Sequence, residues 1–214
     1  MNESSQPSLK LWYSPGACSL AAHVLLLETG LNFDLELSQV GQFTDEFIKL
    51  NPKGRVPVLS LDGEVITEIP AILTAISCLV PEKHLLGETT LETARVYEWL
   101  NYLSGTLHGQ GFGALWRPER FLDDESLFPK LQEHAVWTIR QCYGFIEDKI
   151  ASSQCYYAVG GSFTIVDPFL FVLYRWGYRV EIEMRSEYPH FATWAARISI
   201  KNSVIRAWET HVGI

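Results

Sequence analysis

The hydrophobic pattern of this chain changes once, near residue 82, and that change limits the fold more than any other feature. Before it, segments that alternate apolar and polar residues are interspersed with segments whose apolar residues recur every three or four positions. After about Thr90 the strand-like segments nearly vanish, and helical periodicity dominates near 90–108, 125–150, 165–180 and 190–211. We therefore expect an α/β domain over 9–82, a linker over 83–90 and an all-helical domain over 91–214, preceded by a disordered tail over 1–8.

Within the first domain the residue pattern predicts the element order βαβ-α-ββ-α. Strands are expected at 9–13, 33–37, 56–60 and 64–66, with an Asp-Gly hairpin turn between the last two. Helices are expected at 19–29, in a short segment over 43–50, and at 69–79. Because Phe33, Leu35 and Leu37 alternate with polar residues, one face of the second strand is predicted to lie in the core.

Composition excludes several classes of protein. The chain is 47% hydrophobic, but its longest aliphatic run, 24–27, is far shorter than the ~20 residues that a membrane span needs. The net charge is −8 and basic residues are not clustered, so nucleic acid is not an expected partner. The four cysteines form neither a CxxC nor a His/Cys metal pattern. We expect no bound metal and no membrane association, and we interpret the cysteines as reduced thiols of a cytoplasmic protein.

Cys18 is the first candidate for chemistry, because the predicted strand, loop and helix place it at the first turn of the helix from Ser19. Unpaired N–H groups and the helix dipole favour negative charge there, so the thiol pKa is expected to be lowered toward neutrality. The alternative is that Cys18 is a small buried residue. Cys78 and Cys142 lie inside predicted helices and are interpreted as core residues. Ala21 stands where a resolving cysteine would be, so an outside thiol would have to resolve any mixed disulfide.

Three segments, 9–20 (LKLWYSPGACSL), 28–30 (ETG) and 51–59 (NPKGRVPVL), resemble the glutathione transferases in their order and spacing, and the bacterial beta class most of all. The resemblance runs from residue 9 to about 212, with a short deletion near Gly41. It implies an α/β thioredoxin-like N-terminal domain that binds glutathione and an all-α C-terminal domain that supplies most of a second-substrate pocket. It also implies a homodimer.

The resemblance assigns roles in the first domain. Cys18 matches the cysteine that contacts the glutathione sulfur and can form a mixed disulfide with it. Val56 matches the residue that precedes a cis-proline, here Pro57, and whose backbone pairs with the cysteinyl part of glutathione. Glu68 matches the acid that holds the γ-glutamyl ammonium group, and the helix start at Ile69 suits the carboxylate of the same group.

The second domain carries further candidates. The segment around Asn101 and His108 resembles the part of the family in which an asparagine and a histidine face the site, so His108 is expected to contact the thiolate or the glycyl end. Phe112 and Trp116 are the leading candidates for the second-substrate pocket; other aromatic candidates are Tyr102, Tyr174, Trp176 and Tyr178. The segment 161–167 resembles the helix start of the family's second domain, where Thr164 and Asp167 are predicted to form a capping box.

Two departures from the family pattern set up an alternative function. After Glu68 the family usually has a small or hydroxylated residue, whereas this chain has Ile69 and then Pro70. The deletion near Gly41 also removes a basic residue that often lies near the glycyl carboxylate. The leading hypothesis is a glutathione transferase that acts on a hydrophobic electrophile, or exchanges thiols with a disulfide, through Cys18. The alternative is a transferase-like binding or scaffold protein with weakened affinity for glutathione.

Overall fold

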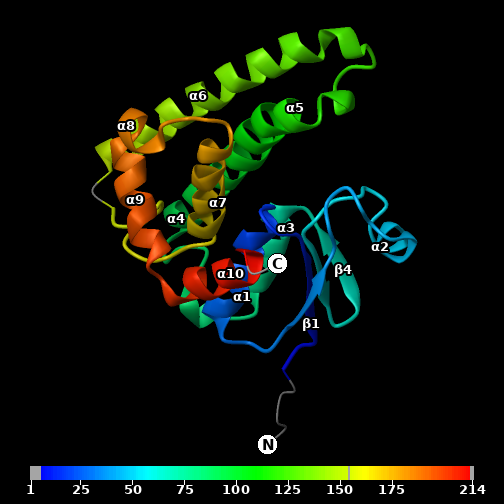
Figure 1. Ribbon diagram of the computed structural model, residues 1–214. Helices are drawn as coiled ribbons and strands as arrows, with labels where there is room; N and C mark the ends of the chain where they lie inside the picture. The colour runs from blue at the N-terminus through cyan, green and yellow to red at the C-terminus, as the bar shows by residue number, and fades with distance from the viewer. Residues whose placement is uncertain (1–5, 154, 213–214) are drawn as a thin grey trace, which may run out of the picture.

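The computed structural model of the protein describes residues 6–153 and 155–212 and shows two abutting domains (Figure 1). The first domain has the predicted element order: β1 Leu9–Tyr13, α1 Ser19–Thr29, β2 Asp34–Leu37, α2 Asp45–Leu50, β3 Val58–Leu61, β4 Glu64–Thr67 and α3 Ile69–Cys78. The second domain is helical, as predicted. The fold class expected from the sequence, a thioredoxin-like domain followed by an all-helical domain, is confirmed.

The sheet of the first domain has the strand order β2-β1-β3-β4. β1 pairs with β2 in parallel, and β3 pairs antiparallel with both β1 and β4. Gly30 ends α1 in the left-handed conformation, with φ 75°, as the sequence predicts. Leu11, Leu25 and Leu59 are fully buried, so β1 and β3 meet α1 across an apolar layer.

The prediction that one face of the second strand lies in the core is wrong. All four residues of β2 are exposed, and Leu35 and Leu37 keep 36% and 45% of their accessible surface. Only Phe33, one residue before the strand, is partly buried and packs against the core. The reason is position, because β2 is an edge strand and alternation along its sequence does not supply a second layer to cover it.

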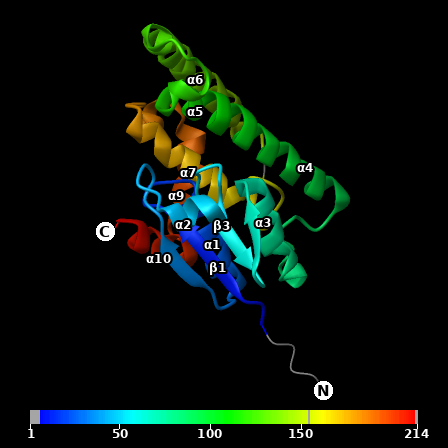
Figure 2. The ribbon, with the colours of Figure 1, turned by 90° about the vertical axis from the view of Figure 1, so that its right-hand side faces the viewer.

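The helical domain contains more segments than the periodicity predicts (Figure 2). Its elements are η1 Pro81–Lys83, α4 Thr90–Asn101, η2 Tyr102–Phe112, α5 Gly113–Trp116, η3 Pro118–Arg120, η4 Glu125–Leu127, α6 Phe128–Ser152, α7 Val166–Arg179, α8 Met184–Glu187, α9 Pro189–Ser199 and α10 Asn202–Val212. None of the helices in the described part of the chain is long and apolar enough to cross a membrane.

The segment near 90–108, where the sequence shows helical periodicity, changes helix type at Tyr102. From there to Phe112 the backbone is π-helical, and α5 then continues it to Trp116. Three glycines lie in the π-helical stretch; at Gly111 an added Cβ would lie 2.8 Å from Ile139 Cγ1 on α6. The close approach of η2 to α6 therefore requires a residue without a side chain at this position.

The segment near 190–211, where the sequence shows helical periodicity, forms two helices, because the chain turns at Ile200 between α9 and α10. The turn brings α10 back onto α1 of the first domain (Figure 1). Glu28 on α1 accepts a hydrogen bond from Ser203 and lies 3.4 Å from the ammonium of Lys201. The last helix thus fastens the two domains together.

The capping box predicted at Thr164 and Asp167 is half right. Asp167 reaches back and accepts a 2.7 Å hydrogen bond from Thr164 N–H, as predicted, and another of 2.9 Å from Ala158 N–H. The Thr164 hydroxyl, however, donates to Asp167 instead of capping the helix, and α7 begins only at Val166. Asp167 is fully buried, so it fixes the loop over the helix start as well as the helix itself.

The predicted tail and the predicted linker each contain a residue that is held by a hydrogen bond. Residues 1–5 of the predicted tail lie outside the described residues, but Ser8 is held by a 2.8 Å hydrogen bond from its N–H to Asp62. In the predicted linker, Leu85 is buried and its carbonyl accepts a 2.9 Å hydrogen bond from Ile165 N–H. Cys78, predicted as a core residue, is exposed, whereas Cys142 is buried as predicted.

Candidate functional site

A cavity of about 930 Å³ lies between the two domains. The first domain supplies the loop before α1, the loop before β3 and the turn from β4 into α3, and the second supplies η2, the segment after it and the end of α7. Its lining includes all but one of the site residues predicted from the sequence: Cys18, Val56, Pro57, Glu68, Ile69, His108, Phe112 and Trp116. Distant parts of the chain therefore converge on one site of a size suited to small molecules.

Cys18 lies where the sequence predicts, immediately before the first residue of α1. It is the N-cap residue of that helix. The preceding turn is fixed by Ser19, whose hydroxyl accepts from Ser14 N–H and donates to Ser14 C=O. The Cys18 thiol donates to the carbonyl oxygen of Val56 at 3.6 Å, so the sulfur is bound to the loop that precedes β3.

The prediction of a lowered thiol pKa is wrong for the protein without ligand. Burial, with a smaller contribution from the negative charge of Glu68, raises the pKa of Cys18 to about 12. The backbone N–H at the helix start acts in the predicted direction, but its effect on the pKa is smaller than that of burial. Only 6% of the residue is exposed, so Cys18 is a neutral thiol at pH 7.

Val56 and Pro57 form the predicted cis peptide bond. Val56 lies two residues before Val58, where the pairing of β3 with β1 ends. The peptide groups of Val56 are therefore outside the strand ladder, at the wall of the cavity. An extended peptide can lie beside this segment and pair with it as an added strand would.

Glu68 occupies a distinctive position in the turn from β4 to α3. Its φ of 71° lies in the left-handed region, which a non-glycine residue adopts only when its surroundings hold it there. Its carboxylate accepts hydrogen bonds from Lys53, whose ammonium also donates to Thr67 at 2.6 Å. In the absence of ligand, the acid predicted to bind an ammonium group thus already has a cationic partner.

The wall that the helical domain contributes is aromatic. The ring of Trp116 lies 4.8 Å from Phe112 and 4.9 Å from Trp176, and His108 lies 5.1 Å from Trp176. Burial lowers the pKa of His108 to about 4, and the positive charge of Arg55 lowers it further. His108 is therefore a neutral imidazole at pH 7, able to donate one N–H.

Asn101, predicted to face the site, does not line the cavity. Its side chain is exposed and donates a 2.8 Å hydrogen bond to the carbonyl of Tyr97, one turn back along α4. The change to π-helix begins one residue later and alters the direction of every following side chain, which places His108 on the cavity wall and leaves Asn101 outside it. Of the further aromatic candidates, only Trp176 lines the cavity; Tyr102, Tyr174 and Tyr178 do not.

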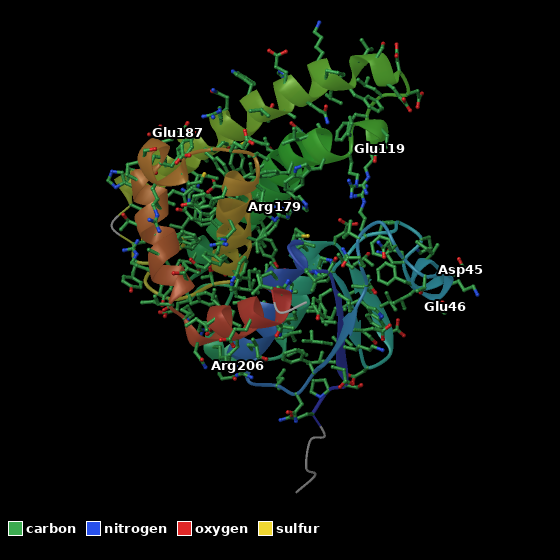
Figure 3. All side chains as sticks on the ribbon, in the orientation of Figure 1. Asp45, Glu46, Glu119, Arg179, Glu187 and Arg206 are labelled. Atoms are coloured by element: carbon green, nitrogen blue, oxygen red, sulfur yellow. The ribbon has the colours of Figure 1, made fainter. Side chains whose placement is uncertain are left out.

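The sequence analysis missed several residues of the site. Two of them are the aromatic rings of Phe43 and Phe121, which line the cavity. The others are four arginines: Arg55, Arg117, Arg120 and Arg179. Figure 3 shows Arg179 at the end of α7, on the side that faces the first domain, and Glu119 in the segment that follows α5. No local pattern gathers these arginines, because Arg55 and Arg179 are far in the sequence from the pair Arg117 and Arg120. No group of His, Cys, Asp and Glu among the described residues is arranged to hold a metal ion.

Two family models match the chain, one on each side of the cavity. They are "Glutathione S-transferase, N-terminal domain", over residues 16–77, and "Glutathione S-transferase, C-terminal domain", over residues 125–201. Among curated proteins, glutathione S-transferase GstA of Escherichia coli O157:H7 is 32% identical over 202 residues, covering 92% of this chain and 95% of the relative.

Solved structures show the same similarity. A beta-class glutathione S-transferase of Sphingomonas chungbukensis superposes with a TM-score of 0.84 at 32% identity, covering 96% of this chain and 100% of that one. A glutathione transferase homologue from Sulfitobacter, solved with bound glutathione, superposes with a TM-score of 0.88 at 26% identity, covering 95% of this chain and 98% of the other. In both comparisons the match extends over the two domains and therefore includes the cavity between them.

Proposed function

The chain belongs to the glutathione S-transferase family, and we propose that it joins glutathione to an electrophile, with the neutral thiol of Cys18 donating a hydrogen bond to the glutathione sulfur. The observation that carries this proposal is the buried thiol at the start of α1, whose single S–H donates to the Val56 carbonyl at the cavity wall. When the glutathione backbone binds this carbonyl, the S–H is released and turns to the glutathione sulfur. A transferase needs its bound sulfur ionised, and a neutral donor stabilises that charge better than a thiolate neighbour would.

In this proposal glutathione lies in the cavity in a defined orientation. Its cysteinyl residue pairs with the backbone of Val56, and its γ-glutamyl ammonium binds Glu68 in place of Lys53. Antiparallel pairing with Val56 sends the glycyl end toward residue 55. Arg55 lines the cavity there, so its guanidinium group is our candidate partner for the glycyl carboxylate. It would replace the basic residue missing near Gly41.

The turn after Glu68 is less favourable for the γ-glutamyl carboxylate. Ile69 keeps a backbone N–H at the start of α3, but Pro70 has none and the hydroxyl usual in the family is absent. Loss of one hydrogen bond to a charged group costs about 1.5–3 kcal/mol, so we expect glutathione to bind with a higher Kd than in a site that keeps this hydroxyl. Substituting Glu68→Gln should weaken binding by a further factor of about 10, measured by calorimetric titration.

The reaction that follows is a substitution at the electrophile. The glutathione thiol loses its proton to solvent, and the sulfur keeps the electron pair. The thiolate then forms the new carbon–sulfur bond while the leaving group departs with the electrons of its own bond. Cys18 and the neutral His108 donate hydrogen bonds toward the sulfur, and the aromatic wall excludes water from it.

Thiol–disulfide exchange through a covalent Cys18–glutathione bond is the competing use of the same residue, and two variants separate it from conjugation. Cys18→Ser keeps a hydroxyl donor but removes the nucleophilic sulfur, whereas Cys18→Ala removes both. We expect Cys18→Ser to retain most of the conjugation of a chloronitroarene and Cys18→Ala to lose it by about 10-fold or more. If both variants lose disulfide reduction while conjugation is unchanged, the donor role is wrong and the covalent role is favoured.

The binding-protein alternative is tested by the titration itself. A transferase-like scaffold gives no heat and no thermal stabilisation with millimolar glutathione, whereas a ligand at 100 times its Kd stabilises a protein by about 2.7 kcal/mol. Stabilisation that is smaller by about 1.3 kcal/mol in Glu68→Gln, as a tenfold weaker Kd requires, would support the enzyme. No stabilisation in the wild-type protein would support the scaffold.

We also propose that two copies of the chain associate through α4 and α6, which are linked by the ion pair between Glu98 and Lys149. Large apolar side chains are exposed on both helices: Leu91 and Tyr97 on α4, Trp137 and Phe145 on α6. Exposed apolar clusters of this kind mark interfaces. Light scattering should give twice the mass of the 24.3 kDa chain, and Trp137→Glu combined with Phe145→Glu should yield the single chain. Ile200→Glu, at a distant exposed site, is the control.

A further inference from the structure

The charge of the cavity differs from the charge of the protein. The chain has a net charge of −8, yet four of its ten arginines line the cavity. Among the described residues that line it, Glu68 is the only acid, and Lys53 already neutralises that acid. The cavity is therefore a positive site in a negative protein, which concentrates small anions.

The guanidinium groups are available to a ligand. In the described part of the chain, none of the four arginines takes part in an ion pair with a carboxylate. Arg117 donates to the carbonyl of Trp116 at 2.8 Å and Arg179 to that of Gly16 at 3.0 Å, which fixes both side chains and leaves further N–H groups on each. An arginine held in this way needs little reorganisation to bind an anion.

Arg117 and Arg120 place positive charge in the part of the cavity that the helical domain lines. Both lie in the segment directly after Trp116, at one end of the aromatic wall. Partial burial lowers the pKa of Arg120, and the positive charges of Arg55 and Arg117 lower it as well, so these three groups lie close enough to repel one another. Glu119, their nearest acidic neighbour in the chain, is exposed and only partly offsets this charge. Like charges held together are relieved by a bound anion.

The aromatic wall sets the shape of the rest of the ligand. Trp116 is the partly exposed ring of this wall and packs against the buried rings of Phe112 and Trp176, and the guanidinium of Arg179 lies 5.1 Å from the Trp116 ring centre. A flat, unsaturated ring stacks on such a surface. The hydrogen bond from Arg179 to Gly16, two residues before Cys18, places this surface next to the reacting sulfur.

We propose that the second substrate is a negatively charged aromatic electrophile, whose ring stacks on Trp116 and whose carboxylate binds Arg117 and Arg120. The inference rests on the proposed function, because it names the acceptor of the same thiol. In this proposal Arg117 and Arg120 select the acceptor by binding its carboxylate, whereas Arg55 binds the glycyl carboxylate of glutathione.

A pair of acceptors that differ only in charge tests the proposal. 4-Chloro-3,5-dinitrobenzoate is an anion, and 4-chloro-3,5-dinitrobenzamide is its neutral counterpart; in both, the glutathione sulfur displaces chloride. Each kcat/KM is divided by the rate constant of the uncatalysed reaction with glutathione, which removes the difference in intrinsic reactivity. We expect the wild-type protein to prefer the benzoate by about 10-fold or more, as a charge-assisted hydrogen bond would give.

The variants locate the preference. Arg117→Gln and Arg120→Gln should each raise the KM for the benzoate by about 10-fold and leave the KM for the amide and for glutathione unchanged. Arg185→Gln, an exposed arginine on α8 that does not line the cavity, is the matched control and should behave as wild type. Equal efficiency with the two acceptors, or a raised KM for glutathione in place of the benzoate, would overturn the proposal.

A binding measurement separates this proposal from the proposed function. Unreactive 4-nitrobenzoate and 4-nitrobenzamide are titrated into the protein without glutathione. Binding of the benzoate that is lost in Arg117→Gln and Arg120→Gln supports the anion site even if glutathione fails to bind, an outcome that would reject only the transferase proposal. Glutathione binding with no discrimination between the two nitro compounds rejects only the anion site.

Discussion

The indole N–H of Trp176, on α7 of the helical domain, donates a 2.9 Å hydrogen bond to the carbonyl of Gly16 in the first domain. Gly16 lies two residues before Cys18, in a left-handed conformation with φ 71°. Arg179 donates to the same carbonyl from one turn further along α7. The helical domain therefore holds the loop that positions the Cys18 sulfur, and the site depends on the contact between the domains.

Substituting Trp176→Phe should loosen this loop. The phenyl ring fills most of the indole's place but lacks the N–H, so we expect a loss of about 1 kcal/mol in the free energy of unfolding. The larger effect should be on kcat, because the Cys18 sulfur moves relative to the bound thiol. Urea unfolding measures the first effect and conjugation kinetics the second.

Trp208→Phe is the matched control for this substitution. Trp208 lies on α10, stacks against Arg175 and does not line the cavity. We expect it to leave kcat unchanged. If Trp176→Phe and Trp208→Phe reduce kcat equally, the bond to Gly16 does not position the sulfur.

The Cys18 thiol should resist alkylation in the protein without ligand. Its raised pKa, about 12, leaves almost no thiolate at pH 7 to 9, and the thiolate is the reactive form. Iodoacetamide labelling followed by peptide mass spectrometry should show Cys18 modified far more slowly than the exposed Cys78 and Cys155. The latter two thus serve as references within the same sample. Rapid labelling of Cys18 at neutral pH would show that the helix start outweighs burial after all.

The example of Cys18 shows what the sequence could and could not predict. Its place before the helix follows from local patterns, namely the strand that ends near Tyr13, the turn residues, and the helix from Ser19 to Gly30. Its protonation state depends on burial, which comes from side chains of distant segments such as Val56. Local reasoning therefore gave the position correctly and the pKa incorrectly.

The helical domain shows the same division. The family resemblance identifies His108 as a candidate, and Phe112 and Trp116 are candidates because they lie just beyond it; all three line the cavity. Periodicity does not reveal the change to π-helix at Tyr102, which turns the side chain of His108 to a different side of the helix from that of Asn101. Nor does it gather the arginines that line the cavity, because tertiary packing alone brings them together.

Asp167 offers a test of the helix start that leaves the chemistry untouched. Its carboxylate accepts from Thr164 N–H, the Thr164 hydroxyl and Ala158 N–H, and it is fully buried. Asp167→Ala should therefore lower the free energy of unfolding by about 3 kcal/mol, since buried N–H groups lose their acceptor. Asp148→Ala, on the more exposed face of α6, should cost well under 1 kcal/mol.

Glutathione binding to folded Asp167→Ala, measured below its melting temperature, is the second readout. Asp167 does not line the cavity, so the Kd should match that of the wild type. A large change in Kd with little loss of stability would assign this carboxylate to the site instead of to the fold.

Two buried histidines where α10 returns to the first domain should make the protein sensitive to acid. The rings of His23 and His211 lie 5.6 Å apart, and Tyr13 packs 4.9 Å from His211. Burial lowers the pKa of His23 to about 4, with Arg206 lowering it further; burial lowers that of His211 to about 3, with His23 adding to the effect. In the unfolded chain both titrate near pH 6.5.

The sign of the effect follows from these values. Above pH 6.5 the histidines are neutral in both states and do not alter stability with pH. Below pH 6.5 both histidines become protonated in the unfolded chain, whereas in the folded protein they stay neutral down to about pH 4. The free energy of unfolding therefore falls by up to about 1.4 kcal/mol per pH unit for each histidine as the pH is lowered. Asp167 acts in the opposite direction, because burial raises its pKa to about 6 and protonation stabilises the folded state.

His211→Phe isolates one of these contributions. Neither ring nitrogen of His211 has a hydrogen-bond partner among the described residues, so a phenyl ring can replace it between Tyr13 and His23. We measure the free energy of unfolding in urea between pH 6 and pH 4, and expect its dependence on pH to be shallower in His211→Phe than in the wild type by the equivalent of about one proton. Asp167 and His108 contribute equally to both proteins, so their effects cancel in this difference. His190→Gln, on the exposed side of α9, should keep the wild-type slope. An unchanged slope in His211→Phe would mean that His211 is protonated in the folded protein over this range.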